Sequence, residues 1–292
     1  MILCYVQLFE VMKTNEKYKL GVALSGGGVR GFAHLGALQA MNERGIFPDL
    51  IAGTSVGSLV GALYADGYSP QEIYKMAEAL KMREFITTAI PYDGFLRSTG
   101  IQSFLKKHLR AKRFEELKTP LRVVASDIEQ GTSFVFTTGE IIPAVAASCS
   151  VPIVFSPVEI SGHYYVDGGL FANFPVSVIR KDCRRVMGVD ISPVISMKYD
   201  RSFKYIIERT MNYMVGANTV KDRKNCDYLI ESAEVSAYSL FDMKSGESIY
   251  EKGYTSAVEY LETHKKKIQR ELLNPPPQTL WHRISRIVKP EK

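Results

Sequence analysis

Residues 20–31 read LGVALSGGGVRG and residues 50–57 read LIAGTSVG, and these two stretches decide the fold. In each, a short apolar run is followed by glycines and then by apolar residues at helical spacing. Short, unbroken apolar runs are typical of strands buried on both faces of a parallel sheet. The pattern therefore predicts strands at 22–24 and 50–52 and helices at about 30–44 and 56–66.

The second stretch places Ser55 at the apex of a strand-to-helix turn with the spacing G-x-S-x-G. A serine on such a sharp bend projects its hydroxyl clear of the sheet, and Gly53 and Gly57 let the backbone pack closely without a Cβ clash. The spacing predicts a nucleophilic serine. It leaves open a turn of small residues that only lets the next helix pack tightly on the sheet.

The first turn also satisfies the dinucleotide-binding pattern G-x-G-x-x-G, through Gly26, Gly28 and Gly31. That pattern requires an acidic residue at the end of the second strand, where it binds the ribose hydroxyls. Here the second strand ends in Gly-Thr-Ser, and Asp49 precedes the strand. The nucleotide-binding interpretation therefore fails, and we expect no cofactor.

Three glycines at a helix N-terminus still suit an anion, because the first N–H groups of a helix are unpaired and lie at the positive end of its dipole. An oxyanion forms on the carbonyl oxygen when a serine attacks an ester. Gly26, Gly27 and Gly28 are thus candidate oxyanion-hole donors, with Arg30 adding positive potential nearby.

Three motifs in this order and spacing resemble the patatin-like phospholipase family of lipid acyl hydrolases, over roughly residues 18–262. They are Ser25-Gly26-Gly27-Gly28-Val29-Arg30-Gly31, Gly53-Thr54-Ser55-Val56-Gly57 and Asp167-Gly168-Gly169. The resemblance implies a Ser-Asp dyad, with Ser55 as nucleophile, Asp167 as general base and the glycine run as oxyanion hole. It further implies a three-layer sandwich, with Gly31, Gly53, Gly57, Gly168 and Gly169 supporting the motifs. The sequence shows no metal-ligand cluster, so we expect catalysis without a metal.

The residues alone do not single out the base. Asp167 ends a predicted strand at 164–166 and is followed by paired glycines, a pattern that is often only a turn. Without the resemblance it ranks only slightly above Asp127 and Asp190. With the resemblance Asp167 is preferred, and the Asn-Phe-Pro sequence at 173–175 strengthens the match.

A Ser-His-Asp triad is the alternative catalytic arrangement. In α/β-hydrolases the histidine comes last in the chain, so only His264 or His282 could follow Asp167, and both are expected to be solvated. His34 and His163 are expected to be structural.

Strands alternate with helical patterns along the chain, which predicts an α/β fold with a mainly parallel sheet and helices on both faces. We expect an N-terminal extension at 1–18, a catalytic domain at 19–270 and a basic, proline-containing amphipathic tail at 271–292. Residues 82–118 are a candidate lid. The Met and Tyr residues of the helical pattern at 202–220 are expected in the core.

The composition of the chain limits which classes of protein and which compartments remain possible. The chain has 292 residues, of which 46% are hydrophobic and 23% charged, an ordinary globular composition. Its four cysteines lack the spacing of a zinc site or a disulfide framework, which favours a reducing, cytoplasmic compartment. No window reaches transmembrane length, and no nucleic-acid partner is expected.

The C-terminal tail is the candidate membrane contact. Residues 265–292 carry a net charge of +6, which equals that of the whole chain. Beyond the triple proline at 275–277, one apolar stripe contains Trp281 and a basic face opposes it, as in interfacial helices. Docking of this stripe on the catalytic domain is an equally open interpretation.

Together these patterns predict a serine acyl hydrolase that acts on fatty-acyl esters of phospholipids or lysophospholipids. The alternatives are a triad esterase and a lipid-binding or regulatory protein without catalysis on the same fold.

Overall fold

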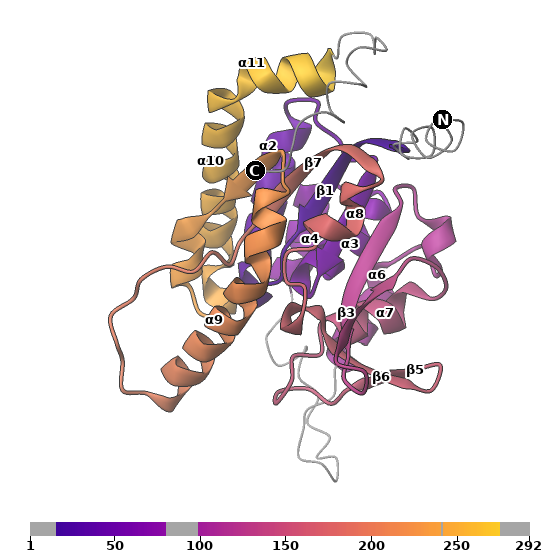
Figure 1. Ribbon diagram of the computed structural model, residues 1–292, viewed down its shortest axis with the longest axis vertical. Helices are drawn as coiled ribbons and strands as arrows, with labels where there is room; N and C mark the ends of the chain where they lie inside the picture. The colour runs from indigo at the N-terminus through magenta and orange to yellow at the C-terminus, as the bar shows by residue number, and fades with distance from the viewer. Residues whose placement is uncertain (1–15, 80–98, 241, 275–292) are drawn as a thin grey trace, which may run out of the picture.

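The computed structural model describes residues 16–79, 99–240 and 242–274, which form one eight-stranded sheet with helices on both faces (Figure 1). The strands are β1 (Tyr18–Leu24), β2 (Leu50–Thr54), β3 (Leu121–Asp127), β4 (Thr132–Phe136), β5 (Val158–Ile160), β6 (His163–Asp167), β7 (Cys183–Asp190) and β8 (Tyr228–Glu231). The helices are α2 (Phe32–Asn42), α3 (Val56–Ala65), α4 (Pro70–Glu78), α6 (Thr99–His108), α7 (Ile141–Ser148), α8 (Val176–Arg180), α9 (Phe203–Lys224), α10 (Gly246–Thr263) and α11 (Lys265–Ile268).

The centre of the sheet is parallel. Strand β1 pairs in parallel with β2 and β7, β2 with β3, and β7 with β8. At one end, β4 and β6 both pair antiparallel with β3, and β5 pairs antiparallel with β6. The prediction of an α/β fold with a mainly parallel sheet is confirmed, and the antiparallel strands form one edge of it.

Alternate side chains of β1 pack into two separate hydrophobic cores, one on each face of the sheet. Val22 and Leu24 lie in the larger core, which contains residues of α2, α3, α4, α6 and α10. Ala23 faces the other way and packs with Phe174 and Ile179, the latter from α8. Because successive side chains of a strand point to opposite faces, this division places helices on both sides of the sheet and makes three layers.

Helix α2 is buried on nearly every side, since α10 covers the face that is turned away from the sheet. A Cβ on Gly253 of α10 would lie 2.3 Å from the carbonyl oxygen of Ala33. The two helices therefore touch through their backbones. This contact explains why the helix predicted at 30–44 has no polar face. A 3₁₀ turn, η1 (Gly28–Gly31), directly precedes α2.

Several local predictions hold and others do not. The sequence Ser-Pro-Gln-Glu at 69–72 predicts a capping box, which is present, with the Glu72 carboxylate accepting the Ser69 N–H. Helical spacing also predicts a single helix over 247–270, and this is wrong, because the chain breaks at His264 into α10, α11 and the π-helical η6 (Gln269–Leu273). Strand β5 and helix α8 were not predicted, being only three and five residues long.

The expected burial of Met and Tyr in α9 is also wrong, because Tyr213 and Met214 are each more than half exposed. Residues 82–98 of the candidate lid and residues 275–292 of the tail lie outside the described residues. The folded body continues past residue 270, since Glu271 is ion-paired with Arg185 of β7 at 2.9 Å. Across the parts that the structure describes, no helix is both long and apolar enough to span a membrane.

Candidate active site

Strand register brings the three sequence motifs together at the end of the sheet where β1 and β2 finish. Leu24 of β1 is paired with Gly53, so the glycine run starts beside the turn that holds Ser55. Thr54 is paired with Val124 of β3, and the next residue of β3 is paired with Asp167. Ser55 and Asp167 thus lie at the same level on either side of β3.

Ser55 occupies a strained backbone conformation. Its φ is +52° and its ψ is −126°, a combination that non-glycine residues rarely adopt. The strain is held in place by hydrogen bonds on both sides of the peptide: the Ser55 N–H donates to Ser148 Oγ at 2.9 Å, and the Ser58 hydroxyl donates to the Ser55 carbonyl at 2.6 Å. The serine is 8% exposed, so its side chain reaches solvent only through a cavity.

The glycines that flank Ser55 lie against other backbone segments. A Cβ on Gly57 would lie 2.3 Å from the carbonyl oxygen of Leu24, and one on Gly53 would lie 2.4 Å from that of Gly57. Gly168 is equally confined, with the Val124 carbonyl oxygen 2.3 Å from a Cβ built there. No side chain fits at these positions. These distances agree with the expectation that glycines are needed here to avoid a Cβ clash.

The Asp167 carboxylate is buried and accepts a hydrogen bond from the Gly169 N–H at 2.7 Å. The Ser55 hydroxyl is a second polar neighbour, and it favours the charged form of this carboxylate. Burial raises the pKa of Asp167 to about 6, against the opposing effect of these two groups. This carboxyl group therefore titrates close to neutrality while it contacts the serine hydroxyl.

The three glycines of the first turn do not all have free N–H groups. The Gly26 N–H donates to the Asn173 carbonyl at 3.0 Å. Within the described part of the chain, no acceptor is found for the N–H groups of Gly27 and Gly28. Gly28 has a φ of +56°, which suits glycine, and both residues line the cavity that contains Ser55. The predicted oxyanion donors thus reduce to Gly27 and Gly28.

Arg30 is not part of the group of residues around Ser55. Its guanidinium is buried, and Nε donates to the Tyr238 carbonyl at 2.9 Å. Burial lowers the pKa of Arg30 to about 10, and Glu208 acts in the opposite direction. Arg30 lines neither of the cavities at Ser55, and its contacts are those of a side chain that fixes the segment around Tyr238.

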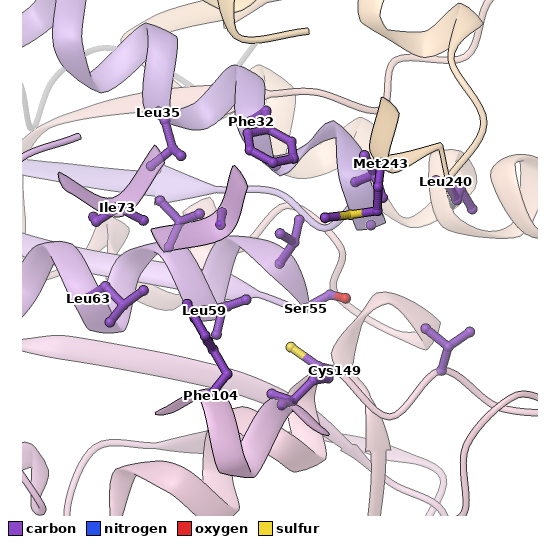
Figure 2. A pocket seen from close by; sticks show the side chains of 18 of the residues that line it. Phe32, Leu35, Ser55, Leu59, Leu63, Ile73, Phe104, Cys149, Leu240 and Met243 are labelled. Carbon is purple, nitrogen blue, oxygen red and sulfur yellow. The ribbon is translucent and has the colours of Figure 1, made fainter. Parts of the chain in front are cut away.

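Two cavities meet at Ser55. The first is almost entirely apolar; Figure 2 shows Leu63 and Ile73 at its far end and Ser55 near the side where Met243 lies. Ile101 and Phe104 of α6 also line it, so part of the predicted lid region does border the site. The second cavity contains Asp167, Asn173 and the glycine run, and α9 forms one wall through Met211 to Val215.

The other candidate bases are engaged away from these cavities. Asp127 Oδ1 accepts the N–H groups of Glu129 and Gln130, and Asp190 is paired with Arg223. His34 is buried, and its Nε2 lies 2.8 Å from the Ser25 carbonyl oxygen. Burial lowers the pKa of His34 to about 4. No histidine is among the described residues that line either cavity, and His282 is outside them.

The sequence assigned no role to Ser148 or Asn218, and it indicated Asn173 only as part of the Asn-Phe-Pro sequence at 173–175. Ser148 links the Ser55 N–H to the Val124 carbonyl of β3. Asn218 of α9 holds the Gly169 carbonyl and the Asn173 N–H. The Asn173 side chain is buried, and its Nδ2 has no partner in the described part of the chain. Only Asn173, close to the Asp-Gly-Gly motif, carried a sequence signal.

Comparison with known proteins agrees with this geometry. The family model described as patatin-like phospholipase matches residues 22–179. The chain belongs to the patatin-like phospholipase family. The matched range spans the glycine run, the Ser55 turn and the Asp167 turn, which are the segments that register brings together.

Relatives within the family differ in length from this chain. An uncharacterized NTE family protein of Mycobacterium bovis is 34% identical over 58% of this chain and 47% of its own length. Lysophospholipase NTE1 of Kluyveromyces lactis is 25% identical over 87% of this chain and 20% of its own length. The chain thus spans less than half of these relatives. VipD of Legionella pneumophila shares the fold, with a TM-score of 0.50 and 17% identity over 85% of this chain and 67% of that chain.

The raised pKa of Asp167 predicts that Asp167→Asn stabilises the protein above pH 6. An aspartate whose folded-state pKa exceeds its ordinary 3.8 contributes stability below 3.8 and loses it as the pH rises through about 6. Asparagine resembles the protonated form at every pH. The variant should therefore melt higher than the wild type at about pH 7.5, and the difference should vanish near pH 4 in thermal unfolding.

The matched control is Asp127→Asn, at the end of the neighbouring strand β3. Its Oδ1 accepts two backbone N–H bonds from the following turn, and asparagine keeps this acceptor, so this variant should not melt higher than the wild type. A lower melting temperature of Asp167→Asn at pH 7.5 would contradict the burial argument.

Proposed function

We propose that this protein is a serine acyl hydrolase that cleaves fatty-acyl esters of phospholipids or lysophospholipids through a Ser55–Asp167 dyad. One observation carries the proposal: a serine hydroxyl on a strained bend lies beside a buried carboxylate whose pKa is raised to about 6, at the junction of two apolar cavities. A perturbed carboxyl beside a serine in a cleft is the arrangement that base-assisted nucleophilic attack requires.

Acylation begins when Asp167 takes the Ser55 proton as Oγ bonds to the acyl carbonyl carbon. The carbonyl π electrons move onto oxygen, and the N–H groups of Gly27 and Gly28 stabilise this oxyanion. The tetrahedral intermediate then expels the alcohol, which takes the proton back from Asp167. In the second half, Asp167 removes a proton from water as the water oxygen bonds to the acyl carbon. The second tetrahedral intermediate then expels the Ser55 oxygen, which takes the proton back from Asp167, and the fatty acid leaves as product.

The two cavities suit the two parts of such a substrate. The first, lined by Phe32, Leu59 and Phe104 among others, takes the acyl chain, because its wall offers apolar contacts along its whole depth. The second takes the alcohol portion, since its polar groups, Ser192 and Asn173, lie beside Asp167. A proton donor for the leaving oxygen is thereby on the side where the alcohol departs.

The dyad is favoured over the triad because no described histidine lines the cavities. Asp167 also needs no histidine, since a carboxylate with a pKa of about 6 is a stronger base than an ordinary aspartate. Phospholipids and lysophospholipids are inferred as substrates from the family and from the name of the Kluyveromyces lactis relative.

The Asn173 amide is a further donor in this mechanism. A Cβ on Gly26 would lie 2.3 Å from Asn173 Oδ1 and 3.2 Å from Ser55 Cβ, so the amide lies next to the nucleophile. Leaving a buried N–H₂ unpaired costs about 1–3 kcal/mol. That cost is offset if Nδ2 donates to the reacting ester, and we assign it this role.

Ser55→Ala should lower ester hydrolysis by about 10⁴-fold or more, because the covalent centre is lost. The same variant should no longer be labelled by a fluorophosphonate, while its melting temperature remains close to that of the wild type. The assay uses a p-nitrophenyl ester series and lysophosphatidylcholine. The matched control is His163→Gln, a half-exposed histidine outside both cavities, which should retain activity.

Three results would count against the proposal. Full labelling of Ser55→Ala would move the nucleophile elsewhere, and an inactive but folded His163→Gln would favour a triad. A wild-type protein that binds lipid but neither hydrolyses esters nor reacts with the fluorophosphonate would be a lipid-binding protein without catalysis.

Asn173→Ala should lower kcat by about 10²-fold with a smaller effect on KM, as expected for a donor that acts on developing charge. The backbone bonds of residue 173 to Gly26 and Asn218 survive this change, and no partner of Nδ2 is lost. The melting temperature should therefore not fall. A normal kcat together with a clear loss of stability would show that the amide is only structural.

A further inference from the structure

Helix α9 turns its hydrogen-bonding side chains toward the protein. Asn218 bonds to the Gly169 carbonyl, Asp222 accepts the Ser177 N–H, and Arg223 pairs with Asp190. Nearer its start, Glu208 accepts the Ser239 hydroxyl. The side of α9 that faces the protein thus carries polar contacts at these four positions, beside Met211 and Val215, which line the second cavity.

The outer face of α9 is apolar. From residue 206 to residue 220, the exposed positions are Ile206, Thr210, Tyr213, Met214, Ala217 and Val220. Their spacing of three, four and seven residues places them along one side of the helix. None is charged, and the four large apolar side chains are each between 45% and 54% exposed. A contiguous apolar face of this kind marks an interaction surface.

This outer face continues into the second cavity. Met214 belongs to both, and Ile153, across the cavity mouth, is 75% exposed. Ile153 has a φ of +73°, which is unfavourable for a β-branched residue. A strained, water-exposed isoleucine therefore lines the cavity that contains Ser55, together with Met214 of α9. Figure 1 shows the first turns of α9 at the lower left, away from the centre of the sheet.

Basic residues border both ends of the face. Lys198 and Arg201 precede the helix, and Lys221 and Lys224 end it, all exposed. One acidic residue, Asp200, lies among them and is bonded to Ser202. Apolar side chains between cations are the composition that binds an anionic lipid surface, whereas a protein partner would find no hydrogen-bonding group except two hydroxyls.

We infer that the outer face of α9, together with Ile153, docks on an anionic lipid surface. Docking there places the mouth of the second cavity against the lipid, so that a lipid ester reaches Ser55 without crossing water. The inference rests on the proposed function for its purpose, but the docking itself requires no catalysis.

The test is the double variant Ile206→Glu, Val220→Glu, two positions that line neither cavity. Binding to vesicles of phosphatidylglycerol and phosphatidylcholine should fall by about tenfold or more, because burial of one such side chain is worth about that factor. Hydrolysis of lysophosphatidylcholine presented in these vesicles should fall in parallel. Hydrolysis of the soluble ester p-nitrophenyl butyrate should stay within about twofold of the wild type.

The matched control is Phe47→Glu. Phe47 is 59% exposed. It precedes the first residue of β2, whereas Ser55 follows the last, so the two residues lie at opposite ends of this strand. This variant should bind vesicles as the wild type does. Vesicle binding is also measured in Ser55→Ala, where it should persist; a failure of catalysis therefore leaves the docking test intact.

Unchanged vesicle binding by the double variant would overturn the inference. Loss of binding on truncation after Asn274, with the double variant normal, would instead assign the contact to the tail at 275–292. A dimer of the wild type in solution that the double variant abolishes, without any vesicle binding, would show that a second copy of the chain covers this face.

Discussion

The approach of the Ser55 hydroxyl to the buried Asp167 carboxylate is the contact on which the rest of the site depends. A carboxylate out of water is costly, and here only the Gly169 N–H and the neighbouring Ser55 hydroxyl reduce that cost, so its proton affinity rises. The same burial that raises the pKa strengthens the carboxylate as an acceptor for the serine proton. The burial of Asp167, the strained backbone of Ser55 and the two cavities all depend on the position of this Ser55–Asp167 pair, which the sheet must fix.

The sheet holds it through register and close backbone contact. Ser55 directly follows β2 and Asp167 ends β6, the strands on either side of β3, and Ser148 from α7 links the serine N–H to β3. Glycines at 53, 57 and 168 let three chain segments meet at distances that exclude a side chain. Because these contacts are between backbones, the strained serine can relax only if whole strands move apart. The family motif is therefore a packing requirement as much as a chemical one.

How much was predictable follows from where each signal lies. Short apolar runs and glycine turns are local, so β1, β2, the Ser55 turn and the parallel centre could be inferred from the sequence. The Gly26 N–H could not, because its partner is a carbonyl 147 residues away. The same holds for Ser148 and Asn218, whose roles come from strand register. Helix α9 was misjudged for a different reason: periodicity finds an apolar stripe but does not say whether that stripe faces the core or the solvent.

The most direct test of the central claim is the pH dependence of Ser55 acylation, measured in single turnover with p-nitrophenyl butyrate. If Asp167 is the base, the rate constant should increase about tenfold per pH unit below about 6 and level off above it, and His163→Gln should give the same curve. Asp167→Asn should lack this transition. A wild-type rate constant that does not change across pH 6, or a transition that survives in Asp167→Asn, would contradict the dyad.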